Sequence, residues 1–130
     1  MRRIFGIGET VLDIIFKNGQ PQAAKPGGSV LNSMVSMGRM GLPVSFISEY
    51  GLDDVGYLID NFLKDNGVNT SVVNRFNKGN TSLALAFLDD KNDAHYTFYK
   101  DIPGKRLDIE FPETRKDDII QFGSFYAIWP

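Results

Sequence analysis

The sequence predicts an α/β fold: a mostly parallel sheet with flanking helices, plus a small antiparallel β lid. Strand-like and helical patterns alternate through residues 4–73, which is the order of a parallel sheet with right-handed crossovers. Two strand-like runs, 81–88 and 94–100, then flank a polar turn with no helix between them. The last apolar run, 119–129, has no following helix to cover it, so we expect the chain to be truncated.

Two short strands are predicted at the amino terminus. Residues 4–8 form one apolar run and residues 11–16 form a second. The Asn18-Gly19 pair that follows is the strongest two-residue hairpin signal. Because two prolines follow within residues 17–26, we expect a loop there that leads to a pair of glycines.

Two helices are predicted after that loop, separated by a strand at 44–50. Apolar residues recur on one face of segment 29–40 at Val30, Leu31, Met34 and Val35. The second helix begins after Asp53, whose carboxylate suits an N-cap. Its apolar residues follow the spacing of an amphipathic helix: Val55, Leu58, Ile59, Phe62 and Leu63. Asn66-Gly67 ends this helix, and a further strand is predicted from Val72.

Composition excludes several classes of protein. The 130 residues suit one domain, and 42% apolar with 23% charged residues is typical of a globular chain. A net charge of −2 with scattered basic residues gives no field for nucleic acid or an anionic membrane. No cysteine is present, which excludes disulfides, zinc-thiolate sites and thiol nucleophiles. The amino terminus is too short and polar for a signal peptide or a membrane span, so we expect a cytoplasmic protein.

A glycine pair at the start of the first helix is the most informative motif. Gly27 and Gly28 precede Asn32 on that helix, and Asp13 lies on the strand before them. Glycine lets backbone approach a ligand closely, and a helix N-terminus adds unpaired N–H groups and a partial positive charge. These groups suit one small polar ligand. The alternative is a turn that needs glycine for its dihedral angles, with a solvated carboxylate and a surface amide.

The predicted hairpin offers a second set of candidate residues. Tyr96, Phe98 and Lys100 share one face of its second strand because side chains alternate along a strand. Phe98 is placed to cover an apolar face of a ligand, and Lys100 to reach a hydroxyl or a carboxylate. The alternative is that this face packs on itself or on a second subunit.

These spaced motifs resemble the ribokinase-like (PfkB) carbohydrate kinases, within them the fructokinase-like branch. The resemblance covers the whole chain as the amino-terminal part of a much longer family member. Its matches are an opening strand with a sugar-binding aspartate at 8–13, the first family signature at 27–32, a Gly-x-Asp-x-x-Gly helix opening at 51–56, a lid ending in Phe98-Tyr99-Lys100, and Gly123-Ser124 in a later strand.

The resemblance implies a ribokinase-like fold and ATP-dependent phosphorylation of a sugar hydroxyl by the full-length protein, with ATP and Mg²⁺ as cofactors. Residues 1–130 would form the amino-terminal part of one such kinase domain, with lid strands near 11–18 and 81–100. The sugar contacts that it implies are Asp13, Gly27, Gly28, Asn32, Phe98 and Lys100. An ionised carboxylate only accepts hydrogen bonds, whereas an amide both donates and accepts, which suits sugar hydroxyls.

The resemblance also implies what this chain lacks. The family's general base lies in a Gly-Ala-Gly-Asp stretch, which this sequence does not contain, and the nucleotide-site segments are absent as well. We therefore expect no catalytic, cofactor-binding or metal-binding residue here, no ATP or Mg²⁺ bound by this chain alone, and no kinase activity from it alone.

Departures from the family pattern bear on the choice of sugar. Val30 and Met34 are bulkier than the family's residues, so we expect an altered pocket shape. Lys100 replaces an arginine, which removes a bidentate fork for a carboxylate and favours a neutral sugar over a sugar acid. Fructose is the first expectation; ribose, a ketodeoxy sugar acid and a nucleoside remain open.

Other functions find less support in the sequence. The third glycine of a dinucleotide fingerprint would fall at Val11, and the first glycine of a Walker loop at Tyr99. His95 is the single histidine and lies near the turn of the hairpin, so we expect neither a serine triad nor a two-histidine metal site. Two alternatives remain: a non-catalytic sugar-binding or dimerisation module that forms a homodimer through the exposed edges of the lid, and a truncated product with no function of its own.

Overall fold

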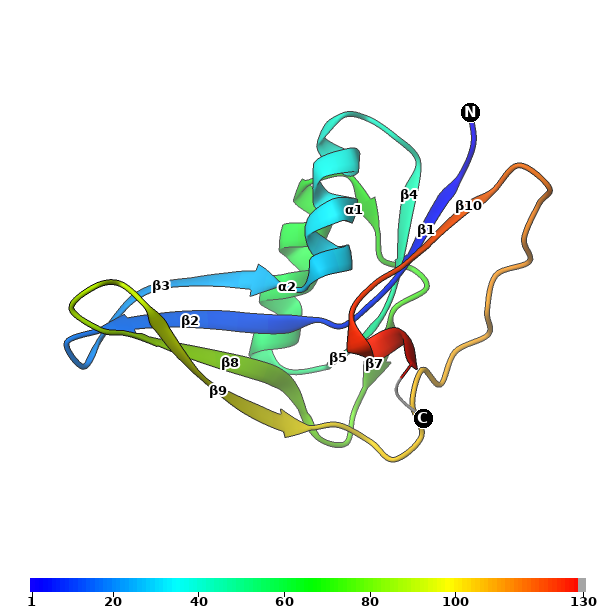
Figure 1. The fold of residues 1–130 in the computed structure, drawn as a ribbon. Coiled ribbons are helices and arrows are strands. Elements are labelled where there is room, and N and C mark those ends of the chain that lie inside the picture. The colour runs from blue at the N-terminus through cyan, green and yellow to red at the C-terminus, as the bar shows by residue number, and fades with distance from the viewer. Residues whose placement is uncertain (129–130) are drawn as a thin grey trace.

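Two β-sheets meet where the first strand continues into the second (Figure 1). The computed structural model describes residues 1–128 of the chain. In sheet A, all neighbouring strands are parallel, in the order β10 (Ile119–Phe122), β1 (Ile4–Ile7), β4 (Val44–Ile47) and β6 (Val68–Asn69). The predicted parallel sheet is therefore confirmed.

Sheet B extends away from the helices as a long, narrow layer (Figure 1). Its order is β3 (Gln20–Gly27), β2 (Val11–Lys17), β8 (Asn80–Leu88) and β9 (Ala94–Asp101). Strands β2 and β3 form one antiparallel hairpin and β8 and β9 another, whereas β2 and β8 run parallel. A two-stranded parallel sheet of β5 (Glu49–Gly51) and β7 (Asn74–Phe76) lies beside them.

The expected loop over residues 17–26 is wrong, because residues 20–27 form strand β3. The turn before it is made by Asn18 and Gly19, whose φ angles of 52° and 73° are those of a tight hairpin turn. Both prolines of this segment are tolerated because β3 is the outer strand of sheet B, where missing N–H donors leave no ladder bond unmade.

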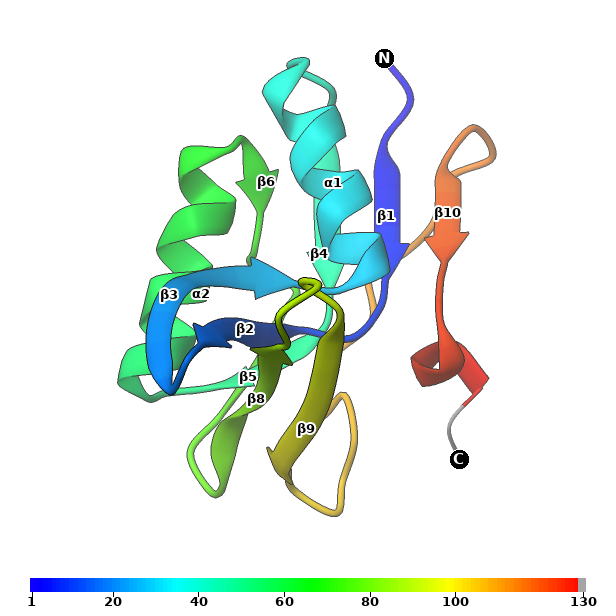
Figure 2. The same cartoon turned by 60° about the vertical axis from the view of Figure 1, so that its left-hand side comes forward.

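Two helices cover one face of sheet A (Figure 2). The helices are α1 (Ser29–Arg39) and α2 (Asp54–Asp65), close to their predicted bounds. Asp53 is the N-cap of α2, and its carboxylate accepts a hydrogen bond from the Gly56 N–H group. The core lies between helices and sheet, and its most buried large side chains are Leu31, Met34, Phe46, Tyr50, Ile59 and Leu63.

Helix α1 packs so closely on the end of β1 that there is no room for a side chain at Gly6 or Gly8. A Cβ at Gly8 would lie 2.6 Å from the Cβ of Val30, and one at Gly6 would lie 2.7 Å from the sulfur of Met34. On the neighbouring chain segment, a Cβ at Gly123 would lie 2.4 Å from a methyl group of Val30. The bulk of Val30 and Met34 is thus accommodated in the core, opposite glycines.

The expected strand over residues 119–129 is shorter in the structure. Strand β10 ends at Phe122, and Ser124 has a φ of 60°, which ends the extended conformation. A 3-10 turn, η1 (Phe125–Ile128), follows, and the rest of the expected strand lies outside the described residues. Within residues 1–128, no helix combines the length and the apolar character needed to cross a bilayer.

Gly8→Ala is expected to lower the free energy of unfolding by about 1–3 kcal/mol, because its methyl group would overlap Val30. Adding Val30→Ala should cost less than the sum of the two separate losses, because the substitutions share one contact. Urea denaturation measures both. Gly104→Ala is the matched control, since its Cβ meets no atom within 4 Å; an equal loss there would contradict the packing argument.

Candidate functional site

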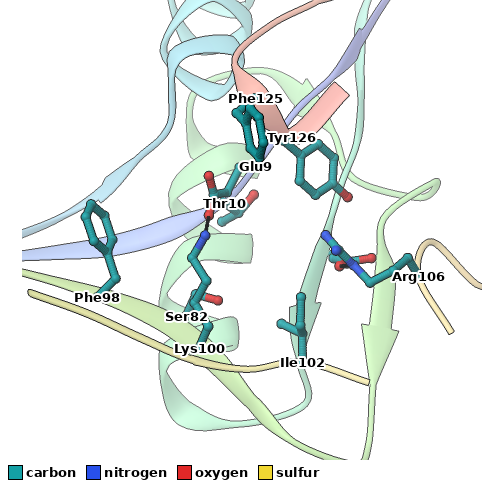
Figure 3. A pocket seen from close by; sticks show the side chains of 10 residues that line it. Glu9, Thr10, Ser82, Phe98, Lys100, Ile102, Arg106, Phe125 and Tyr126 are labelled. Atoms are coloured by element: carbon teal, nitrogen blue, oxygen red, sulfur yellow. Dashed lines mark hydrogen bonds and ion pairs between the residues drawn. The ribbon is translucent and has the colours of Figure 1, made fainter. Parts of the chain in front are cut away.

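A hollow of about 210 Å³ lies where sheet B joins the body of the protein (Figure 3). Its walls come from the β1–β2 connection, the strands β5, β8 and β9, the loop after β9, and η1. The lining residues are Glu9, Thr10, Glu49, Ser82, Phe98, Lys100, Ile102, Arg106, Phe125 and Tyr126. Apolar rings and charged groups face the same space, which is typical of a site for a small polar molecule with apolar faces.

Two of the predicted sugar-binding residues line this hollow. Lys100 forms an ion pair with Glu9, and its ammonium group lies 5.8 Å from the centre of the Phe98 ring. The Phe98 side chain is more than half exposed, so its face is available to a ligand. The hairpin therefore brings Phe98 and Lys100 together, as their spacing predicts.

Asp13 does not line the hollow, but it lies on the same face of sheet B as Phe98. The register pairs Asp13 with Ala84 on β8, and Ala84 with Phe98 on β9. Directly paired residues point to the same side of a sheet, and two strand spacings separate the outer pair by about 10 Å. Ala84 is buried between them, so the row places a carboxylate and an aromatic ring on one face of the sheet, two strands apart.

The two signature glycines have a steric reason in the structure. A Cβ at Gly27 would lie 2.0 Å from the Asp13 Oδ2 atom, and one at Gly28 would lie 2.2 Å from the carbonyl oxygen of Glu9. Gly28 also has a φ of +130°, a conformation that L side chains rarely adopt. The glycines thus let the end of β3 and the start of α1 approach β2 and the connection before it; hydrogen bonding of a sugar by their N–H groups stays a prediction.

The Asp13 carboxylate is partly buried, and this burial raises its pKa, while the nearby Lys25 ammonium opposes the rise. Lys25 is its direct partner across the β2–β3 pair. An acceptor that loses hydration in the folded state gains more from a hydrogen-bonding ligand than a fully solvated one does. The position therefore suits a carboxylate that binds hydroxyl groups.

Asn32 does not line the hollow. Its exposed side chain lies in a separate shallow groove between α1 and β10, together with Ser33, Ser36, Met37 and Gln121. The Gln121 side-chain amide donates to the Ser33 hydroxyl across that groove at 3.1 Å. The structure therefore does not bring Asn32 together with Phe98 and Lys100, and its contact with a sugar stays a prediction.

A buried ion pair that the sequence analysis missed forms another wall of the hollow. The Glu49 side chain is 4% exposed and is bound by the Arg106 guanidinium and by the Leu107 N–H group at 2.7 Å. The guanidinium also lies 5.2 Å from the centre of the Tyr126 ring. Leu107 has a φ of 47°, an uncommon angle for leucine that the bond to Glu49 helps to hold. The one sequence signal for a role of Glu49 was that a charged residue stands within the otherwise apolar run 44–50.

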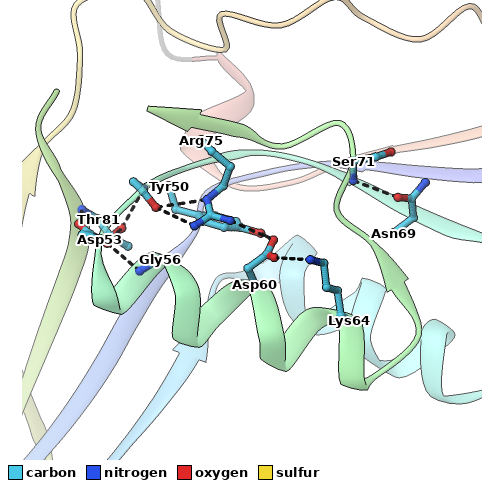
Figure 4. Close-up of polar contacts among 10 residues, drawn as sticks. Tyr50, Asp53, Gly56, Asp60, Lys64, Asn69, Ser71, Arg75 and Thr81 are labelled. Carbon is cyan, nitrogen blue, oxygen red and sulfur yellow. Dashed lines mark hydrogen bonds and ion pairs between the residues drawn. The ribbon is translucent and has the colours of Figure 1, made fainter. Parts of the chain in front are cut away.

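A second polar cluster fixes α2 to the strands that carry the hollow (Figure 4). The Asp60 carboxylate accepts from the Tyr50 hydroxyl at 2.7 Å and pairs with Lys64 and Arg75. The Asp53 carboxylate accepts from the Thr81 N–H group at 2.7 Å, which ties the start of α2 to β8. Burial tends to raise the pKa of both carboxyls, but these hydrogen bonds outweigh it and lower both. These contacts give the cluster a structural role, because they hold α2 against β5, β7 and β8.

The described residues contain no cluster of ligands for the Mg²⁺ that the resemblance implies for the full-length protein. Within residues 1–128, no three His, Cys, Asp or Glu side chains are grouped so that they could hold a metal ion. The carboxylates of the hollow are each paired with a cation, Glu9 with Lys100 and Glu49 with Arg106.

Comparison with known proteins identifies the class. The fructokinase structure from Xylella fastidiosa is 28% identical, with a TM-score of 0.67 over 77% of this chain and 34% of that one. A structure of the Xylella fastidiosa fructokinase with bound ATP is 25% identical, with a TM-score of 0.67 over 76% of this chain and 33% of that one. The fold is thus that of the ribokinase-like sugar kinases.

The sequence relatives agree with the structural ones. The profile of the pfkB family carbohydrate kinases matches residues 1–126, and the chain belongs to this family. A probable chloroplastic fructokinase-6 of Arabidopsis thaliana is 33% identical over 79% of this chain and 28% of the relative. A probable fructokinase-5 of the same plant is 27% identical over 96% of this chain and 42% of the relative. The chain therefore spans less than half the length of these relatives.

Arg106→Met is expected to lower the free energy of unfolding by about 3 kcal/mol, because it leaves the Glu49 carboxylate buried without its cation. Replacing both residues, as Glu49→Gln with Arg106→Met, should restore part of this loss. Chemical denaturation of the three chains measures the effect. Lys105→Met is the matched control: its side chain is 77% exposed, so a change of less than about 0.5 kcal/mol is expected. Equal losses at 105 and 106 would refute the assignment.

Proposed function

We propose that this chain supplies the sugar-holding part and the lid of an ATP-dependent sugar kinase of the fructokinase type. The observation that carries the proposal is the row Asp13, Ala84 and Phe98 on one face of sheet B, beside the start of α1. Membership of a carbohydrate kinase family supports the reaction class. The names of the fructokinase relatives support fructose as the first substrate to test.

Each residue has a definite part in this proposal. The Asp13 carboxylate accepts hydrogen bonds from sugar hydroxyls, and the N–H groups of Gly27 and Gly28 donate to sugar oxygens. Phe98 covers an apolar face of the ring, and Lys100 donates to a hydroxyl. Asn32 is kept as a proposed contact from α1, although in this chain its side chain lies in the groove between α1 and β10. Sheet B would then close over the sugar and keep water away from the reacting hydroxyl.

The phosphoryl donor lies outside what this chain provides. In the proposal, ATP and Mg²⁺ bind to further parts of the full-length protein, and the fructokinase structure with bound ATP supports ATP as the donor. Phosphoryl transfer depends mostly on positioning and charge stabilisation. This chain would contribute the positioning of the acceptor hydroxyl. We further propose the cytoplasm as its location.

Asp13→Asn is expected to weaken fructose binding by at least about tenfold, because an amide presents one acceptor oxygen instead of two. Isothermal titration calorimetry on the chain measures this. Wild-type affinity should fall as the pH is lowered through the raised pKa of Asp13, because only the ionised carboxyl accepts at both oxygens. Asp90→Asn, in the exposed turn of the β8–β9 hairpin, is the matched control. Undiminished binding by Asp13→Asn would remove Asp13 from the site.

An ADP-release assay separates this chain from a family-length one. We expect no fructose-dependent ADP release from residues 1–130, and release from the same sequence extended to family length. The reason is that this chain lacks the Gly-Ala-Gly-Asp stretch, which in the family opens the helix that stabilises the transferring phosphoryl group. Turnover by the short chain would contradict the proposal.

A non-catalytic sugar-binding or dimerisation role is the second candidate, and the edge of sheet B favours it. Strand β9 has an unpaired edge, and its aromatic residues Tyr96, Phe98 and Tyr99 are each more than half exposed. Such an edge can pair with a second copy. Absence of sugar binding, together with a molecular mass that doubles with concentration in sedimentation experiments, would favour the dimerisation role over the kinase.

A further inference from the structure

Thr10 lines the hollow, although no sequence motif singles it out. The residue is 4% exposed, and its hydroxyl oxygen lies 2.7 Å from the hydroxyl oxygen of Ser48, which is fully buried. The Ser48 hydroxyl in turn donates to the carbonyl oxygen of Gly8 at 2.7 Å. Three oxygen atoms thus form a hydrogen-bonded chain that leads from the wall of the hollow into the core.

The direction of the protons along this chain is fixed. A carbonyl oxygen can only accept, and a serine hydroxyl has a single proton to donate. Because Ser48 gives its proton to Gly8, it can only accept from Thr10. The Thr10 proton therefore points toward Ser48, and the lone pairs left on the Thr10 oxygen can only accept a hydrogen bond.

The groups next to Thr10 in the hollow also favour a ligand that donates a hydrogen bond. Glu9, next to Thr10 in the chain, is a carboxylate and also only accepts. The Lys100 ammonium is the nearby donor, and it is already paired with Glu9. A ligand atom that meets Thr10 must therefore carry a hydrogen to donate. A hydroxyl group meets this condition, whereas an ether oxygen or a fluorine atom does not.

We propose that Thr10 is a specificity-determining residue of the sugar site. Its hydroxyl oxygen accepts a hydrogen bond from one substrate hydroxyl, because its own proton is already donated to Ser48. The inference rests on the proposed sugar-binding function and adds to it a residue and a direction of hydrogen bonding. Sites built to pair a substrate hydroxyl reject analogues that lack it, because their own buried polar group is then left unpaired.

The test is a binding scan with D-fructose and its monodeoxy and monodeoxyfluoro analogues on the chain, by calorimetry and fluorine NMR. Fluorine replaces a hydroxyl at similar size but cannot donate. At one ring position, the fluoro analogue should bind about tenfold more weakly than fructose, as weakly as the deoxy analogue. No such position in the wild-type scan would overturn the inference without any variant.

Thr10→Val removes the lone pairs at nearly constant size. This variant should bind fructose about tenfold more weakly and should no longer distinguish the analogues at that one position. Thr10→Ser keeps the hydroxyl and should keep the discrimination. Thr97→Val is the matched control, because it lies on β9 with its side chain on the face opposite to Phe98. Thermal melting checks that every variant is folded.

The outcomes separate this inference from the proposed function. A Thr10→Val chain that keeps the wild-type affinity, or the wild-type fluoro penalty, overturns the role of Thr10 while sugar binding stands. A wild-type chain that binds neither fructose nor ribose overturns the sugar site itself, and the inference with it.

Discussion

The close approach of α1 to the first two strands is the constraint on which the rest of the structure depends. Glycines at positions 6, 8, 27, 28 and 123 leave no side chain between the helix and the strands, and each is closed to a Cβ by a neighbouring atom. Glycine costs conformational entropy on folding. Three side chains of this helix, Val30, Leu31 and Met34, are buried in the core, and their burial offsets that cost. The same packing fixes the start of α1 beside Asp13.

The electrostatics of the hollow follow from one segment of chain. Lys100 ends the aromatic face of β9 and pairs with Glu9, while Arg106 in the next loop pairs with Glu49. Both cations come from one stretch of chain, residues 100–106, whereas the carboxylates come from the β1–β2 connection and from β5. The position of that stretch therefore determines the charge that a ligand meets. With the stretch in place the charges balance, which agrees with a neutral polyhydroxy ligand.

Sequence reasoning succeeded where the signal is local and failed where pairing partners matter. The apolar spacing of α2 and the capping chemistry of Asp53 are short-range features, and both helices are close to their predicted bounds. Strand β3 was missed because its prolines indicate a loop, and only its position at the edge of sheet B makes them acceptable. The strand predicted beyond Phe122 ends early because Ser124 takes a left-handed conformation.

The sequence by itself determined both helices, the β8–β9 hairpin, the glycine signature and the resemblance to a family of sugar kinases, because each depends on residues close together in the chain. Tertiary structure alone decided which distant side chains come together. The Asp13–Ala84–Phe98 row depends on the register of three strands, and the pair of Glu49 with Arg106 joins residues 57 positions apart. Such contacts arise from sheet order and loop path, which no local pattern encodes.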